Sequence, residues 1–160
     1  MKRKTIFLTL ALILPVLVFL FLKFFGRNKF EIPVYYQDTI EIPRDCLVNF
    51  KAPYSVSDST LIALGVDLHR ACLILFKNMT GENDIRLREE VQQNKLQIVN
   101  LAEVLSKEKE RQMRCIFLLP DKFNSVLLDE QRRIRGYYQV DSRDETDRLL
   151  VELKILFNDY

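Results

Sequence analysis

The chain has 160 residues, of which 48% are hydrophobic and 29% charged, a composition that suits one ordinary domain plus an additional element. Its charge is unevenly distributed: residues 1–30 carry six basic and no acidic residues, whereas the rest carries 18 basic and 22 acidic residues, a net charge of −4. A mildly acidic domain without basic blocks interleaved with aromatic residues is a poor nucleic-acid binder, so we expect no nucleic-acid partner.

The N-terminal segment predicts a membrane anchor. Residues 5–22, TIFLTLALILPVLVFLFL, contain no charged residue. A helix over the span 5–25 would be roughly 27–32 Å long, close to the hydrocarbon thickness of a bilayer. A cleaved signal peptide is the alternative, but the run exceeds the usual apolar region of about 7–15 residues, and neither a small-x-small cleavage site nor a lipobox cysteine follows. We therefore expect residues 1–29 to be an uncleaved anchor that tolerates Pro15.

Basic residues flank this span on both sides, so the positive-inside rule gives a near tie. The first flank is short and compact, and a large domain is translocated largely regardless of its charge. We therefore expect a single-pass protein of the inner (cytoplasmic) membrane whose C-terminal domain is periplasmic. The flanking basic residues are Lys2, Arg3, Lys4, Lys23, Arg27 and Lys29.

Residues 30–60 predict an extended stalk between the anchor and the domain. The segment has few long apolar runs and contains Pro33, Pro43 and Pro53. Prolines bias a chain away from helix, both at their own positions and at the residue before.

Residues 61–160 alternate between strand-like and helix-like patterns, which predicts one α/β domain. Residues 71–76 (ACLILF) form a continuous apolar run that is typical of a buried strand, and residues 96–101 (LQIVNL) predict a second strand. The polar segment 84–95 between them predicts a helix with Asp84 near its start.

A second helix is predicted over residues 106–113, with its start near Glu103. The apolar stretch 115–120 (CIFLLP) either finishes that helix or forms a strand, because periodicity does not decide between the two. Residues 125–129 (SVLLD) and 133–140 (RIRGYYQV) then predict two strands that are joined by a short hairpin at EQRR.

The last predicted element is a helix that begins after Ser142. Ser142 and Glu145 have the spacing of a capping box, and Asp141 and Asp144 add negative charge at the positive end of the helix. One apolar face follows, made of Leu149, Leu150, Leu153, Leu156 and Phe157. The order strand, helix, strand, helix, strand, strand, helix predicts a thioredoxin-like fold, which opens with a right-handed β-α-β unit and closes with a hairpin and a helix.

Residues 126–156, VLLDEQRRIRGYYQVDSRDETDRLLVELKIL, closely resemble the C-terminal part of Bacteroidetes-type SCO/SenC proteins. The phrase FEIPVYYQ is similar to the lead-in of these proteins, as are the residues that follow it, Cys46, Tyr54, Ser55 and Val56. An N-terminal anchor fits as well. These stretches cover about half of the chain, and IRGYY with the following helix is the most specific of them.

The resemblance implies a thioredoxin-like fold and a role in delivering copper or reducing equivalents to the Cu(A) site of cytochrome oxidase. The family holds copper with a CxxxC pair after the first core strand and a distal histidine, since soft thiolates suit both Cu(I) and thiol–disulfide exchange. Here no cysteine lies between Cys72 and Cys115, Asp121 falls at or near the position of the histidine, and Arg132 or a neighbour replaces the turn glycine. The sequence thus resembles a degenerate member without the family's chemical residues.

The cysteines show no metal or redox spacing. Cys72 and Cys115 lie in apolar runs and are expected in the core, with a Cys72–Cys115 disulfide as an alternative in an oxidising compartment. Cys46 lies in the stalk, where we expect an exposed residue that could be a reactive thiol or pair between chains. We expect neither a metal site nor a cofactor; if copper is bound, Cys46 and Met79 are the candidate ligands. His69, the only histidine, is expected to be an ordinary surface or loop residue.

Four residues of the predicted hairpin form the candidate partner-binding patch. Arg133 and Arg135 lie on one face of their strand, where we expect them to pair with acidic residues of the last helix. Tyr137 and Tyr138 face opposite sides, which predicts one in the core and one exposed. No Ser-His-Asp, HExxH, P-loop or GxGxxG pattern is present, so we predict no catalytic residues and no enzyme.

Three hypotheses of function follow. The first is a membrane-anchored, SCO/SenC-like, non-catalytic protein that binds a partner in envelope or respiratory-complex assembly. The second is a divergent copper or thiol carrier that uses Cys46. The third is a structural envelope protein that is unrelated to respiration.

Overall fold

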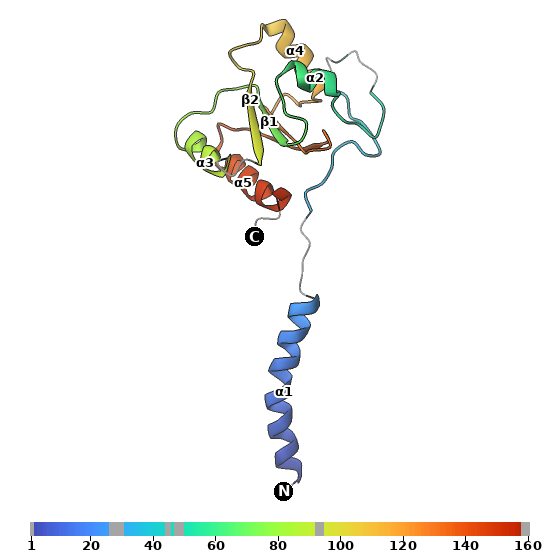
Figure 1. Cartoon of the computed structure of the whole chain (residues 1–160), viewed down its shortest axis with the longest axis vertical. Helices are drawn as coiled ribbons and strands as arrows, with labels where there is room; N and C mark the ends of the chain where they lie inside the picture. The colour runs from blue at the N-terminus through green and yellow to red at the C-terminus, as the bar shows by residue number, and fades with distance from the viewer. Residues whose placement is uncertain (1, 26–30, 44–45, 47–49, 92–94, 158–160) are drawn as a thin grey trace. The chain divides into compact units, whose positions relative to one another are not determined.

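The computed structural model has two units, Met1–Glu31 and Ile32–Tyr160 (Figure 1). Helix α1 of the first unit runs over Lys2–Phe25. The side chains of residues 11–21 are all apolar and all exposed, so the helix has no polar face there. Counting only the residues that are described with their side chains, no helix is long and apolar enough to cross a membrane. The structure describes residues 2–25, 31–43, 46, 50–91 and 95–157.

The second unit is a mixed α/β domain around a four-stranded sheet with the strand order β2-β1-β3-β4. Strands β1 and β2 are parallel, whereas β3 is antiparallel to both of its neighbours. All four predicted strands are confirmed, each slightly shorter than expected. The strands are β1 (Ala71–Leu75), β2 (Leu96–Asn100), β3 (Ser125–Leu128) and β4 (Ile134–Tyr138).

In the described part of the domain four helices pack around this sheet, three of which the sequence predicts. A short helix, α2, precedes β1 and was not expected; its N-cap is Ser57, whose hydroxyl accepts a hydrogen bond from the Thr60 N–H. Six residues are too few to show a helical period in the sequence. The helices are α2 (Asp58–Ala63), α3 (Glu82–Val91) between β1 and β2, α4 (Lys107–Ile116) between β2 and β3, and α5 (Arg143–Phe157) after β4.

The C-terminal end of α4 decides how the apolar stretch 115–120 folds. The helix continues to Ile116, so the stretch finishes the helix and the alternative of a strand is wrong. Leu118 then turns the chain out of the helix with a φ of 48°. Residues 117–119 are nevertheless buried, which shows that this apolar run fills the core as a loop.

Helix α5 confirms the predicted apolar face. It begins directly after Ser142, and Leu149 and Leu153 are fully buried. The carboxylate of Glu145, expected in a capping box, accepts a hydrogen bond from Arg148 at 2.7 Å. The partly buried residues of the same face are Leu150, Leu156 and Phe157.

Both faces of the sheet are covered, and for this reason β1 is buried along its whole length. Ala71, Leu73 and Leu75 pack on the side of α3 and α5. Cys72 and Ile74 point to the opposite face and pack on the side of α2 and α4. Figure 1 shows the two helix pairs on opposite sides of the sheet.

The segment before α2 belongs to this compact domain, in contrast to the separate stalk expected over residues 30–60. Ile32 and Val56 are buried, and the Tyr35 N–H donates to the Ile134 carbonyl at 2.9 Å. Together with the hydrogen bond from the Val56 N–H to the Arg132 carbonyl, this contact joins the segment to the hairpin, so the compact unit begins at Ile32 rather than at residue 61. Parts of the predictions lie outside the described residues, namely 1 and 26–30 of the anchor and stalk, 44–45 and 47–49 of the stalk, 92–94 of the first helix and 158–160 at the end of the domain.

Tyr137 and Tyr138 point to opposite faces as expected, but both are buried, with 3% and 0% of their surface exposed. The prediction that one of them is exposed is wrong, because both faces of β4 are covered. Gly136 lies on the same face as Tyr138, and a Cβ at this position would collide with the Tyr138 ring. A glycine is therefore required where that ring folds back over the strand.

We predict that Leu153→Ala lowers the free energy of unfolding by about 2–5 kcal/mol, because it removes a fully buried side chain from the core between the sheet and α5. Val151→Ala on the same helix is the matched control, since Val151 is 58% exposed and should change stability by less than about 0.5 kcal/mol. Urea unfolding of the full chain in non-ionic detergent measures both values. Equal losses would contradict the burial pattern.

Candidate functional site

A network of polar side chains occupies the carboxyl end of β1, where the SCO/SenC resemblance implies a thiol pair. Lys77 Nζ lies 2.8 Å from Asp141 Oδ2, and Asn124 Nδ2 donates to Asp141 Oδ1 at 2.6 Å. The hydrogen bond from Lys77, followed by that from Asn124, lowers the pKa of Asp141 below its usual value. The Asn124 Oδ1 also accepts from the Val140 N–H at 2.9 Å, so this asparagine ties β3 to the chain after β4.

The network continues to the end of β2. Asn78 Nδ2 donates to Glu103 Oε1 at 2.6 Å, and Asn100 Nδ2 donates to Asn78 Oδ1 at 2.6 Å. Sequence reasoning missed these asparagines, whose only signal is that each one follows or ends a strand. Met79 lies just beyond and packs into the core beneath, with 9% of its surface exposed. Within the described part of the chain, no group of three or more His, Cys, Asp or Glu residues could hold a metal ion.

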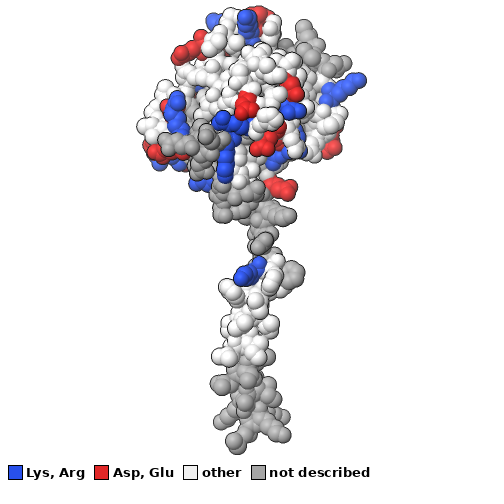
Figure 2. All heavy atoms as spheres, in the orientation of Figure 1, with Lys and Arg blue, Asp and Glu red and all other residues white. Residues whose placement is uncertain are grey.

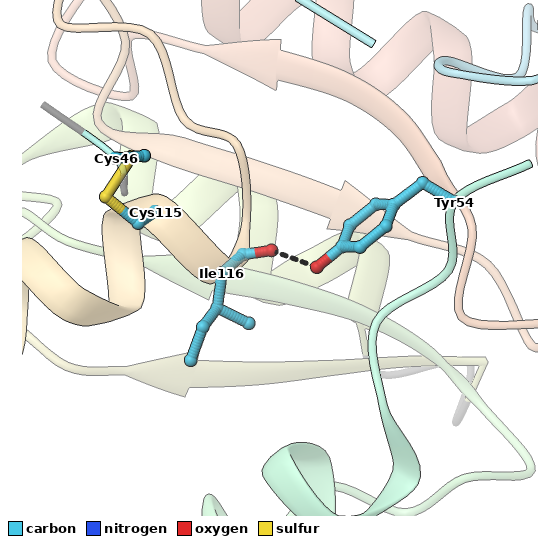
Figure 3. The surroundings of a disulfide bond; sticks show 4 residues. All are labelled: Cys46, Tyr54, Cys115 and Ile116. Carbon is cyan, nitrogen blue, oxygen red and sulfur yellow. Dashed lines mark hydrogen bonds between the residues drawn. A yellow bond between two sulfur atoms is a disulfide. The ribbon is translucent and has the colours of Figure 1, made fainter. Parts of the chain in front are cut away.

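Cys46 and Cys115 form a disulfide, with their Cα atoms 5.4 Å apart (Figure 3). The alternative Cys72–Cys115 pairing is therefore wrong, as is the expectation of a free, exposed Cys46. The reason is that the presumed stalk returns to α4, where the Tyr54 hydroxyl donates to the Ile116 carbonyl at 2.6 Å. Burial raises the pKa of Tyr54 to about 12.

Cys72 is a free thiol on β1 with 2% of its surface exposed, as expected for a core cysteine. Burial raises the pKa of this thiol to about 12, so it stays protonated and unreactive in the folded protein. The disulfide, in contrast, lines a cavity of about 260 Å³. Three basic residues, Lys107, Arg111 and Arg114, line the same cavity, together with the acidic Glu110 and Asp121.

The two arginines of the candidate patch pair with Asp129, not with acidic residues of α5 as expected. Asp129 is only 7% exposed, and its Oδ2 lies 2.7 Å from Arg133 Nη2 and 3.4 Å from Arg135 Nη1. Its Oδ1 accepts the N–H groups of Gln131 and Arg133 and so shapes the β3–β4 turn. Arg135 Nη2 also donates to the Ile32 carbonyl at 2.5 Å, which fixes the start of the domain to β4.

Arg132 takes the glycine-like position of this turn. Its φ is 63°, in the left-handed region that favours glycine. The Arg132 carbonyl accepts the Val56 N–H at 3.0 Å, and its Nε lies 2.7 Å from Asp58 Oδ1. These contacts hold an arginine in a conformation that a glycine would adopt more readily.

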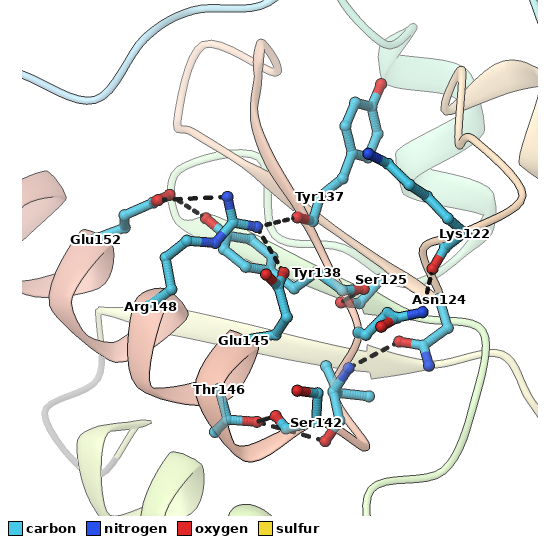
Figure 4. A network of polar contacts seen from close by, with 12 residues as sticks. Lys122, Asn124, Ser125, Tyr137, Tyr138, Ser142, Glu145, Thr146, Arg148 and Glu152 are labelled. Carbon is cyan, nitrogen blue, oxygen red and sulfur yellow. Dashed lines mark hydrogen bonds and ion pairs between the residues drawn. The ribbon is translucent and has the colours of Figure 1, made fainter.

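The two tyrosines of the candidate patch are parts of the core rather than of a surface. Tyr137 donates its hydroxyl hydrogen to the Phe117 carbonyl at 3.0 Å, and Tyr138 donates to Glu152 of α5 (Figure 4). Arg148 lies beside them, with its guanidinium carbon 4.7 Å from the Tyr138 ring centre and Nη2 donating to the Tyr137 carbonyl. Burial raises the pKa of both phenols above the usual value, so they act as neutral hydrogen-bond donors.

A larger cavity of about 540 Å³ lies beside Asp129, at the end of the sheet where β1 begins and β3 ends. Its walls include Arg70, Arg133 and Arg135, and His69, which is exposed as expected. Figure 2 shows basic and acidic residues interspersed on the visible face of the domain, without one dominant charge. The domain thus carries a polar network at one end of β1 and an arginine-lined cavity at the other.

No family model, no curated protein and no solved structure matches the chain.

We predict that peptide mapping without reduction finds one Cys46–Cys115 cross-link and that Cys72 is alkylated only after denaturation. The double variant Cys46→Ser/Cys115→Ser should lose about 2–5 kcal/mol of stability, because the cross-link restricts the unfolded chain over 69 positions. Adding a reductant to this variant should leave its unfolding midpoint unchanged, whereas the parent chain should lose stability. A Cys72 peptide in the cross-linked fraction would show that the pairing is wrong.

Proposed function

We propose that the chain is a single-pass protein of the inner (cytoplasmic) membrane whose periplasmic domain has a thioredoxin-like fold and binds a protein partner without catalysis. The sheet order β2-β1-β3-β4, with a parallel first pair and a closing hairpin and helix, supports this fold. The uncharged stretch 5–22 and its basic flanks support the anchor.

The proposal that the domain is not catalytic rests on one observation, the polar network at the carboxyl end of β1. Asn78 and Lys77 follow this strand, and their side chains are already bonded to Glu103 and Asp141. Amide and ammonium groups supply neither a nucleophilic thiolate nor the soft sulfur ligands that Cu(I) prefers. We therefore infer that this end of the sheet is a binding surface and not a redox or copper centre.

The resemblance to SCO/SenC proteins supports a partner from a respiratory or envelope assembly. An apolar residue for such a contact lies next to the network: Val104 is 77% exposed and directly follows Glu103. It is placed in the turn after β2, so a partner at this end of the sheet would cover it. Contact with a partner would remove this exposed apolar side chain from water.

A second candidate function is a thiol carrier, which the disulfide beside the 260 Å³ cavity favours. A partner dithiol would attack through one thiolate at Cys46 or Cys115, forming a mixed disulfide and releasing the other cysteine as a thiolate. The second partner thiol would then break the mixed disulfide. The partner would leave oxidised, and this protein would leave reduced, with two free thiols.

We predict that a photo-reactive benzoylphenylalanine at position 104 of the full chain, expressed in its native membrane, gives a discrete cross-link to one protein. The same amino acid at position 151 is the control, because Val151 is also exposed but lies on α5, away from the network. Mass spectrometry of the adducts identifies the partner. Oxidase subunits would support a respiratory role, whereas identical adducts from both positions, or none, would contradict a partner surface at this end of the sheet.

We also predict that the oxidised full chain in detergent does not bind Cu(I) in competition with a chelator, because both Cys46 and Cys115 are in the disulfide. Reduced protein and the Cys46→Ser variant are titrated alongside. Tight 1:1 binding by the reduced chain that is lost in Cys46→Ser would overturn the scaffold proposal in favour of a copper carrier. Disulfide transfer to a dithiol peptide without copper binding would favour the thiol carrier.

A further inference from the structure

The cavity of about 540 Å³ beside Asp129 has the size of a small-molecule site and is built by several elements. Arg70 precedes β1, Lys95 precedes β2, and Arg135 lies on β4. Leu156 and Phe157 at the end of α5 add an apolar wall. The cavity lies at the end of β1 opposite to the proposed partner surface, so the two are separate sites.

Positive charge is concentrated in this cavity, although the sequence after residue 30 has a net charge of −4. Four basic side chains line it, against the carboxylates of Asp129 and Glu130. Asp129 is already shared by two of the cations, through contacts of 2.7 and 3.4 Å. The lining therefore has a positive excess, which favours an anion. The basic residues are Arg70, Lys95, Arg133 and Arg135.

Two of these arginines have a buried donor for which the described residues offer no acceptor. The Nε atoms of Arg70 and Arg135 are buried and have no hydrogen-bond partner among the described residues. The side chain of Arg135 is only 11% exposed, so most of its charge is removed from water. Since buried guanidinium groups without full compensation are costly, an anion in the cavity would stabilise both.

The apolar wall and Lys95 indicate which kind of anion would fit the cavity. Lys95 Nζ lies 5.7 Å from the centre of the Phe157 ring, which places an ammonium group beside a hydrophobic surface. Guanidinium groups match the oxygens of phosphate with paired hydrogen bonds, and a doubly charged phosphate suits an excess of positive charge better than a single carboxylate. A phosphate with an apolar or ester portion would use both walls.

We propose that this cavity binds a phosphate group, either as a free phosphate or as the headgroup of an anionic phospholipid. Arg70 and Lys95 contribute positive charge to the lining, and Arg135 fixes the rear wall through its bond to the Ile32 carbonyl. Phe157 contacts the part of the ligand next to the phosphate. The site does not depend on the partner surface or on the disulfide.

The test is calorimetric titration of the full chain in non-ionic detergent with inorganic phosphate. Saturable 1:1 binding is expected, weakened about tenfold in Arg70→Gln and in Lys95→Gln, since a charge-assisted hydrogen bond is worth about one decade of affinity. Arg88→Gln is the matched control, because Arg88 is an exposed arginine that pairs with Asp84 on α3, away from this cavity. Unchanged unfolding midpoints confirm that the variants are folded.

The source of the phosphate is distinguished with dihexanoyl phosphatidic acid, with dihexanoyl phosphatidylcholine as the control lipid. Binding of the phosphatidic acid that is at least tenfold tighter than that of inorganic phosphate supports a lipid headgroup, and similar affinities support a free phosphate. The proposal is overturned if neither anion saturates, or if Arg88→Gln loses as much affinity as Arg70→Gln.

Discussion

The structure depends on the burial of β1 on both of its faces. Each residue of Ala71–Leu75 is buried, so the chain must supply an apolar layer above and below the sheet. On one face α3 and α5 provide this layer. On the other face α4 and the short α2 are supplemented by the loop 117–119 and by the segment that precedes α2, from which Val56 is almost fully buried. The segment expected to be a stalk is therefore needed as part of the core.

The elements that were predicted correctly are those whose signal is local. Residues 71–76 are an apolar run of strand length, and the face of α5 repeats with the helical period, so propensity and packing agree. The burial of Tyr138 and the pairing of Cys46 with Cys115 depend on which segments meet in space. A sequence read along one strand shows which face a tyrosine points to, but not whether another layer covers that face.

The candidate sites also divide into features with a local sequence signal and features that depend on distant segments. The absence of a thiol pair after β1 is visible in the sequence, whereas the bonds of Asn78 and Asn124 are not, since their partners Glu103 and Asp141 lie 25 and 17 positions away. Arg135 lies on β4 as predicted, whereas Arg133 lies just before that strand, and the partner of both arginines is Asp129 of the same hairpin. The carboxylate across the tight turn lies nearer to these arginines in the chain than the acidic residues of α5 do.

The disulfide gives the domain a covalent ring, because Cys46 and Cys115 are 69 positions apart in the chain. Strands β1 and β2 and helices α2 and α3 lie inside this ring, whereas β3, β4 and α5 follow it. Suppose that the N-terminal segment is pulled until the contacts of the residues before Cys46 have broken. The force then passes through the disulfide from Cys46 directly to the end of α4. The residues inside the ring are then bypassed by the tension. A pull on the N-terminal segment can thus leave the central parallel strands folded, and a single proteolytic cut inside the ring leaves both parts of the chain covalently joined.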